Sequence, residues 1–355
     1  MSLSIEYLIL LLVIIFCIIW DEENKHAFVV LMLIMTFMGV FRGLNVGSDH
    51  AGWEQDFYII KSFGSSYYHD FEIGYVSLIL FFKHFSNDWL WFSGLTFLVP
   101  MIGTFYFIKQ YKISYAWAIF IFYIFGIYFA AFNSMRQYMA ICSIAAFSYL
   151  LNEKKYLIFA LLTIAVALLL HKSTIIMLLL IPIHLFVQNK HIHKVYLYLI
   201  IIFSYLLSYV DVKIIILPIL AILDFIGLAG DYSQYASSEA HLNSNIYALV
   251  LTLYVLLLVF VSDNNDFSSE KYTVVLFIVL YNIFNLLSIY GTRVAYPFEY
   301  YLIVYVPMLL KKLNGTRNGI ILKIATLVCG LGYFLACFAI SNVSSVNPYE
   351  NWLFE

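Results

Sequence analysis

The stretch ISYAWAIFIFYIFGIYFAAF, residues 113–132, followed directly by Asn133-Ser-Met-Arg136-Gln137, decides the fold class of this chain. Its apolar part runs for 20 residues without a charged side chain, which is about the length of helix that crosses a bilayer. The arginine then lies directly against that run. Because an Arg, Lys or Asp at mid-span costs roughly 2.5–3.5 kcal/mol on insertion scales, this pattern indicates a polar site inside a membrane protein.

The composition of the whole chain supports the same class. Hydrophobic residues make up 63% of the 355 residues, charged residues only 11%, and the mean hydropathy is +0.90, whereas soluble domains carry about 25% charged residues. We therefore expect an all-α, polytopic membrane protein of about 12 to 14 transmembrane helices, with residues 1–355 forming a single integral membrane domain. The net charge of −2 argues against nucleic acid as a partner.

Two of the apolar runs are poor candidates for full spans. The run at residues 74–85 is short and carries Lys83, and the run at 212–230 contains Pro218 and Asp224. Either run is compatible with a re-entrant or interfacial segment. The first run, Ile5–Trp20, has no basic leader before it, and we expect it to be a first span and not a removed signal.

Short basic loops predict the orientation. Four short loops, around 109–112, 152–155, 188–194 and 311–317, each carry two or more basic residues, and the positive-inside rule puts them in the cytoplasm. Helical hairpins between them then place four polar segments on the extracytoplasmic face: 133–137, 171–173, 231–245 and 291–293. The loop 42–72 fits this face only if the run 74–85 does not cross fully, or if Lys109 and Lys112 are exceptions to the rule. We expect the loop to join the other four segments.

The loop 42–72 offers candidates for a general base. Asp49 follows two glycines, and Glu72 opens the next apolar run. A carboxylate held there can accept a proton from a hydroxyl, and Asp49 is slightly favoured over Glu72. Aromatic residues of the loop suit stacking on sugar rings or anchoring at the membrane surface, among them Trp53, Tyr67, Tyr68 and Tyr75. Asp49, His50, His69 and Asp70 could instead bind a metal, although their spacing is not diagnostic.

Helix starts carry the candidate cationic groups. Asn133 or Ser134 is a competent N-cap, which puts Arg136 in the first helical turn. A cation there opposes the helix dipole, and the arrangement makes sense if an anion such as phosphate completes it. His171-Lys172-Ser173-Thr174 repeats the pattern, with Ser173 or Thr174 as the cap. A later arginine, Arg293, either joins this site or pairs with Glu299.

The ordered set of motifs resembles the EpsG family of Wzy-like polysaccharide polymerases. It comprises Arg-Gly…Gly-x-Asp at 42–49, Glu-x-Gly-Tyr at 72–75, Asn-x-x-Arg-Gln at 133–137, His-x-Ser at 171–173 and the late Arg293. The resemblance implies a GT-C-like bacterial inner-membrane enzyme that polymerises O-antigen, capsule or exopolysaccharide repeat units. Its active site would be extracytoplasmic, and its substrate an oligosaccharide on undecaprenyl pyrophosphate. Other partners would be membrane lipid and a chain-length regulator.

The residues suit that chemistry independently. Arginines match phosphate oxygens bidentately and stay charged, so the expected pyrophosphate-binding residues are Arg136, Arg293, Arg42, Gln137 and Asn133. The expected catalytic residues are Asp49, Glu72 and His171. Neither a GxxxxGK[ST] nor a GxGxxG motif occurs, which is consistent with a lipid-linked donor. We expect no metal and no other cofactor, because arginines can neutralise the diphosphate.

Two alternative functions fit parts of the pattern. A transporter or flippase of a lipid-linked or anionic substrate would also place Arg, His and Asp in its spans, but should show discontinuous helices in matching halves. A membrane acyltransferase could use His171 as its base, but its acyl donor would be cytoplasmic. Incubating the protein with lipid-linked repeat units and separating the products on a gel distinguishes the three functions. A polymerase would give a ladder of products, a transporter or flippase would leave the units unchanged, and an acyltransferase would give a single shift in mass.

Overall fold

The computed structural model describes residues 3–62, 71–189, 192–209, 244–263, 267–285, 291–342 and 345–354. Every regular element in these ranges is helical, and none is a β-strand, so the expectation of an all-α chain is confirmed for them. Contacts within the chain define two compact units. The first comprises Met1–Ile175 with Leu331–Glu355, and the second comprises Ile176–Gly330.

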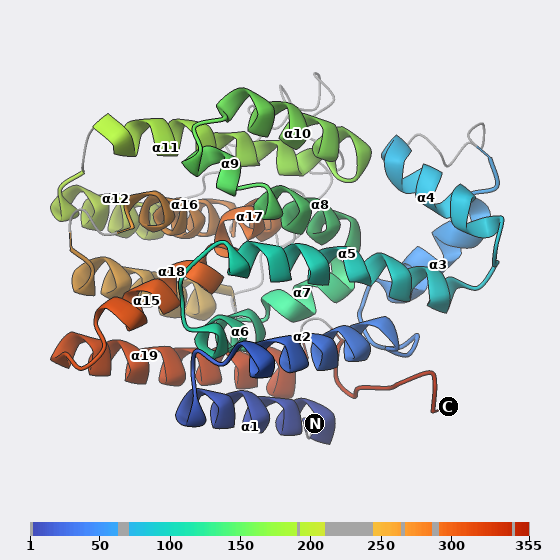
Figure 1. Cartoon of the computed structure of the whole chain (residues 1–355), viewed down its shortest axis with the longest axis horizontal. Coiled ribbons are helices and arrows are strands. Elements are labelled where there is room, and N and C mark those ends of the chain that lie inside the picture. The colour runs from blue at the N-terminus through green and yellow to red at the C-terminus, as the bar shows by residue number, and fades with distance from the viewer. Residues whose placement is uncertain are drawn as a thin grey trace. The chain divides into compact units, whose positions relative to one another are not determined.

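The first unit holds the helices up to the end of α10 (Figure 1). Within it α2 packs against α5 and α6, α1 packs against α6, and α5 and α8 lie along each other. Its helices are α1 Ile5–Trp20, α2 Lys25–Val40, α3 His50–Ile59, α4 Ile73–Lys83, α5 Trp89–Lys109, α6 Tyr115–Ile124, α7 Ile127–Asn133, α8 Met135–Ala146, α9 Tyr149–Asn152 and α10 Tyr156–Leu169. A 3-10 helix, η2 Lys172–Leu179, follows α10.

The second unit packs α12 against α15 and α16. Buried polar side chains join these three helices, because Thr252 donates to Asn282 and Asn282 donates to Ser204. Such interhelical hydrogen bonds are the usual polar contacts between helices in lipid. The remaining elements are α11 Leu180–Asn189, α12 Lys194–Leu207, α15 Ser244–Val261, α16 Ser268–Phe284, η3 Gly291–Val294, α17 Tyr296–Glu299 and α18 Leu302–Lys312; α19 Arg317–Phe334 and the π-helical turn η4 Leu335–Ile340 continue into the first unit.

Helix length limits how many segments can cross a membrane unaided. Among the described residues, two uninterrupted helices are long and apolar enough, Trp89–Lys109 and Arg317–Ile340. A third span arises if α6 and α7, bent by 49°, count as one. Seven shorter apolar helices of 10 to 17 residues accompany them. In the part of the chain that the structure describes, the two or three long spans are fewer than the 12 to 14 expected for the whole chain, because several apolar runs there form helices shorter than 18 residues.

The bend between α6 and α7 precedes the polar segment 133–137. Gly126 takes a positive φ of 76° there, a conformation that glycine adopts without steric cost. Both helices are almost entirely buried, and α7 ends at Asn133, directly before α8. Ser134 occupies the N-cap position of α8, as expected, but its side chain makes no capping hydrogen bond.

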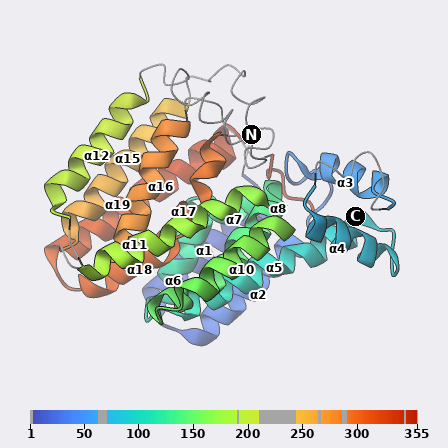
Figure 2. The ribbon, with the colours of Figure 1, turned by 90° about the horizontal axis from the view of Figure 1, so that it is seen from above.

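The short apolar run at 74–85 forms only α4, which has 11 residues. At about 1.5 Å per residue this helix covers roughly half the hydrocarbon thickness. Lys83 at its end donates to the carbonyl of Ile60, just after α3, and Figure 2 shows α3 and α4 together beside the start of α5. This geometry favours the expectation that the run does not cross fully.

Residues 345–354, here termed the C-terminal segment, brace the loop after α2. The N–H groups of Gly43 and Gly47 donate to the carbonyls of Glu350 and Ser345 at 2.8 and 2.9 Å. Trp352 in turn donates its N–H to the carbonyl of Phe41 at 3.1 Å. The loop that precedes Asp49 is therefore fixed by a segment some three hundred residues away in the sequence.

Gly47 should be the least replaceable residue of this loop. Its φ is +112°, and a Cβ there would lie 2.9 Å from Oδ1 of Asn133. We expect Gly47→Ala to lower the free energy of unfolding by about 1–3 kcal/mol, because an L residue is strained in this conformation. Thermal unfolding of the purified protein measures the loss. Gly52→Ala in α3, where a Cβ has open space, is the control, and equal effects of the two substitutions would contradict the prediction.

Candidate functional site

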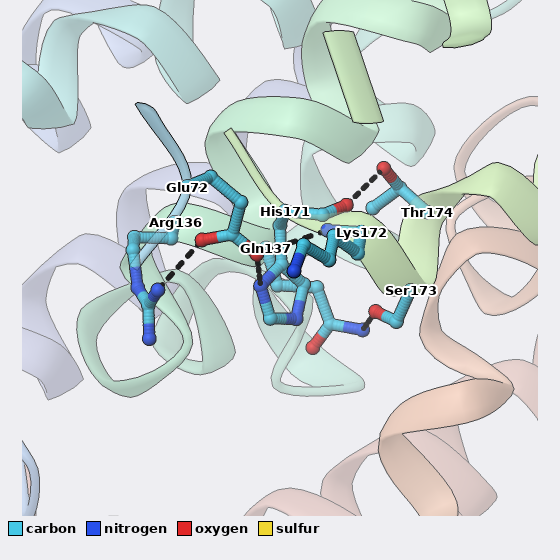
Figure 3. Close-up of polar contacts among 7 residues, drawn as sticks. All are labelled: Glu72, Arg136, Gln137, His171, Lys172, Ser173 and Thr174. Carbon is cyan, nitrogen blue, oxygen red and sulfur yellow. Dashed lines mark hydrogen bonds and ion pairs between the residues drawn. The ribbon is translucent and has the colours of Figure 1, made fainter. Parts of the chain in front are cut away.

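The carboxylate of Glu72 is the centre of a polar cluster in the first unit (Figure 3). Its Oε2 accepts from Nη1 of Arg136 at 2.7 Å. Its Oε1 accepts the backbone N–H of Lys172 at 3.0 Å and lies 3.4 Å from Nδ1 of His171. One carboxylate thus connects residues that the sequence separates by up to a hundred positions.

Element ends position all of these groups. Glu72 immediately precedes α4, Arg136 lies in the first turn of α8, and Lys172 begins η2. Each lies where a helix begins, so backbone N–H groups are free of intrahelical partners there. Part of the anion expected at these helix starts is therefore supplied by the protein itself, in the form of Glu72.

The surroundings keep Glu72 ionised. Burial alone would raise the pKa of its carboxyl, but the contact with His171, the charge of Arg136 and the N–H of Lys172 outweigh burial and lower the pKa to about 2. Only 7% of its side chain is exposed. A carboxylate this strongly held is a poor proton acceptor at neutral pH, which argues against Glu72 as the general base.

Aromatic rings enclose the guanidinium of Arg136. Its Cζ lies 4.8 Å from the ring centroid of Trp53, 4.6 Å from that of Phe71 and 5.5 Å from that of Tyr75. Cation–π contacts of this kind hold a guanidinium without using its N–H groups. Trp53 and Tyr75 thus contact a cation, and their expected stacking on sugar or anchoring at the membrane surface stays a prediction.

Most N–H groups of Arg136 have no acceptor among the described residues. A guanidinium carries five N–H groups, and in the described part of the chain Glu72 is the only acceptor bonded to Arg136. Its Nε is buried and has no acceptor among those residues, while 16% of the side chain is exposed. A further acceptor, most suitably an anion with several oxygens, would complete the coordination.

The other expected residues of these two segments lie beside the cluster. Gln137 donates from Nε2 to Oγ of Ser173 at 3.4 Å, and Thr174 donates from Oγ1 to the carbonyl of His171 at 2.7 Å. Ser173 and Thr174 do not cap a helix, because η2 begins one residue earlier, at Lys172. That part of the sequence prediction is wrong. The backbone N–H of Thr174 already bonds the carbonyl of His171 at 3.1 Å, so the turn closes before either hydroxyl could cap it.

Arg42 belongs to a different buried network. It donates to the carbonyl of Gly39 at 2.6 Å and to Oγ of Ser93 at 3.1 Å, and the same Ser93 contacts Nε2 of His50 at 2.9 Å. Burial lowers the pKa of Arg42 to about 10, so it stays charged at neutral pH. Its contacts fix the loop after α2, and its expected binding of pyrophosphate stays a prediction.

Asp49 lies at the N-cap of α3, where its side chain accepts from Ser48 at 3.0 Å. Its carbonyl accepts the N–H of Trp53, so one helical turn separates Asp49 from a ring that contacts Arg136. This position is compatible with the expected role of a base, which stays a prediction. No group of three or more metal-ligating side chains occurs among the described residues; His69, Asp70 and residues 231–243 of the second loop lie outside them.

Arg293 lies in η3 of the second unit. Its convergence with Arg136 therefore stays a prediction. The alternative, an ion pair with Glu299, does not occur between these two described residues.

Sequence reasoning missed two parts of the site. The backbone N–H of Lys172 was not anticipated as a ligand of Glu72, although a helix start after His171 was the signal for free N–H groups. Phe71 was not anticipated either, because nothing in a sequence shows which aromatic ring will stack on which arginine.

The apolar helices and this buried cation–carboxylate cluster define an integral membrane protein with a polar site. More specifically, the chain belongs to the EpsG family, whose family model matches residues 25–351. Members of this family are Wzy-like polymerases, so the resemblance seen in the motifs is confirmed. No curated protein and no solved structure matches the chain, and the expected GT-C-like architecture stays a prediction.

The pairing of Glu72 makes a prediction about pH. Because its pKa falls from the ordinary 4.5 to about 2, its contribution to stability is complete above about pH 4.5 and is lost as the pH falls toward 2. The wild type should therefore exceed Glu72→Gln in thermal stability at pH 7, and the difference should shrink between pH 4.5 and 2. Thermal unfolding midpoints of the wild type and of Glu72→Gln, recorded from pH 7 to pH 2, measure this difference in stability. A difference that does not change with pH would show that the ion pair contributes nothing.

Proposed function

We propose that this chain is a polysaccharide polymerase that uses a lipid-linked glycan donor. The acceptor hydroxyl of a second repeat unit attacks the anomeric carbon of the donor glycan. The bond from that carbon to the pyrophosphate oxygen breaks, and undecaprenyl pyrophosphate leaves with the electron pair. The hydroxyl proton passes to a base of the protein, and no metal or nucleotide is needed for this balance.

One observation carries the proposal: Arg136 is partly buried and held by Glu72 and three aromatic rings, yet most of its N–H groups lack an acceptor among the described residues. A diphosphate leaving group develops negative charge on several oxygens as the glycosidic bond breaks. Donors that are already oriented toward that charge stabilise the transition state more than mobile ones do. The aromatic enclosure and Glu72 supply this orientation, and membership of the EpsG family supports the class of reaction.

Glu72 acts in this proposal as the residue that orients two others. It holds Arg136 through one N–H group and approaches Nδ1 of His171. A histidine whose one nitrogen faces a carboxylate can present the other nitrogen to a substrate hydroxyl. His171 is therefore the favoured base, and Asp49, one turn from Trp53, is the second candidate.

The distribution of basic residues supports an extracytoplasmic placement of the site. α5 ends at Lys109, and Lys154 and Lys155 follow α9, so two basic loops lie beyond the ends of α5 and α8 that are remote from Arg136. By the positive-inside rule that end faces the cytoplasm. The site then faces outward, in the bacterial cytoplasmic membrane, where lipid-linked repeat units are polymerised.

Loss of the guanidinium should abolish polymerisation. We expect Arg136→Ala to reduce turnover by about 10²–10³, the usual cost of removing one preorganised donor to a developing charge. Arg136→Lys should recover only a little, because a point charge cannot replace a planar fork of donors. The assay follows the ladder of products formed by the purified protein from lipid-linked repeat units. Lys109→Ala, at the remote end of α5, is the matched control, and full activity of Arg136→Ala would remove this residue from the site.

The base can be identified by comparing two substitutions. His171→Gln should lose turnover while it keeps donor affinity, because the amide preserves polarity but cannot accept the proton. Asp49→Asn should retain most activity if His171 is the base. Donor binding and turnover of both variants separate the cases. An inactive Asp49→Asn with an active His171→Gln would transfer the role to Asp49.

A further inference from the structure

A groove on the surface of α5 and α8 lies in the same unit as the Glu72 cluster. Its volume is about 510 Å³, within the range of about 300–1,000 Å³ typical of small-molecule sites. We call it the α5–α8 groove. It is lined by Val99, Ile102, Gly103, Tyr106, Gln110, Ser143, Ala146, Phe147 and Tyr149.

The register of the two helices places this groove relative to Arg136. Thr96 of α5 contacts Sδ of Met135, which directly precedes Arg136. Further along both helices, Gln110 donates to the carbonyl of Ala146 at 2.8 Å. α5 and α8 are therefore parallel, and the groove begins beyond the end at which Arg136 lies.

Arg136 and the groove also share a face of α8. Residues seven and four positions apart lie on one face of a helix, and this spacing relates Arg136, Ser143 and Phe147. Seven residues correspond to about 10 Å along the axis. Ser143 and Phe147 both line the groove.

Packed side chains connect the two regions. Tyr75, which contacts Arg136, and Met139, one turn beyond Arg136 on α8, belong to the same buried cluster. Val99 packs against that cluster and also lines the groove. Packed apolar side chains thus connect Tyr75, beneath the guanidinium, with Val99 in the groove wall.

We propose that the α5–α8 groove binds the apolar chain of the same lipid whose anionic head binds at Arg136. The inference rests on the proposed function and extends it, because it assigns the isoprenoid part of the donor to named residues. The head group would lie at the start of α8, and the chain would follow the helices deeper into the membrane. One molecule with a multiply charged anionic head and a long apolar tail fits both features.

A second groove fits this ligand less well. It has a volume of about 610 Å³ and lies among α1, α2 and the C-terminal segment. Two carboxylates, Glu6 and Glu350, line it, and they would repel a nearby diphosphate. The α5–α8 groove has no charged residue in its lining.

The test compares two probes, inorganic pyrophosphate and geranylgeranyl pyrophosphate, in binding measurements on the whole purified chain at a fixed detergent concentration. Ala146→Trp fills the groove from α8, and Tyr106→Ala removes part of its wall on α5. We expect each substitution to lower the affinity for geranylgeranyl pyrophosphate by about tenfold or more. Neither should change the affinity for inorganic pyrophosphate. Leu95→Trp, an exposed position of α5 outside the groove, should leave both affinities unchanged.

Retained pyrophosphate binding also shows that a variant is folded. If Ala146→Trp alone fails that check, Tyr106→Ala decides the question. Equal affinity of both variants and the wild type for geranylgeranyl pyrophosphate would overturn the groove proposal, and would leave the groove to the chain of an ordinary membrane phospholipid. Failure of the proposed function looks different: Arg136→Ala would then bind both probes as tightly as the wild type does.

Discussion

The buried carboxylate of Glu72 is the constraint on which the polar site depends. A buried charge is tolerated only when it is paired and hydrogen-bonded, and this one receives Nη1 of Arg136 and the N–H of Lys172. Those two contacts connect the starts of α4, α8 and η2. If the carboxylate were absent, the guanidinium would be left against aromatic rings without any acceptor among the described residues. Glu72 thus both connects three helix starts and orients the cationic group of the proposed site.

Much of this could be predicted from the sequence because lipid makes charges expensive. Apolar composition predicted the helical class, and the polar interruptions at Glu72, Arg136 and His171 predicted which segments would meet. Their meeting is the strongest part of the sequence analysis, since it required a loop and two helix starts to converge. The experiments on Arg136 and His171 therefore test two residues that the sequence pattern identified and that both lie against Glu72 in the structure.

Other features depend on tertiary packing that no pattern encodes. Within the described residues the structure has two or three long apolar spans, fewer than the 12 to 14 expected for the whole chain, and hydropathy does not register breaks such as the bend at Gly126. Helix-cap chemistry placed Ser134 correctly but misassigned Ser173, because a 3-10 turn starts earlier than an α-helix pattern suggests. Arg42 was expected to bind pyrophosphate together with Arg136, and only the structure shows its full burial and its separate contacts with Gly39 and Ser93.

The C-terminal segment has a consequence for biogenesis. Ribosomes deliver the loop after α2 some three hundred residues before the carbonyls of Ser345 and Glu350 that accept its N–H groups. During insertion the loop must satisfy Gly43 and Gly47 with water or translocon groups. A nascent chain that stalls late would carry most of its helices and still lack a settled loop beside Asp49.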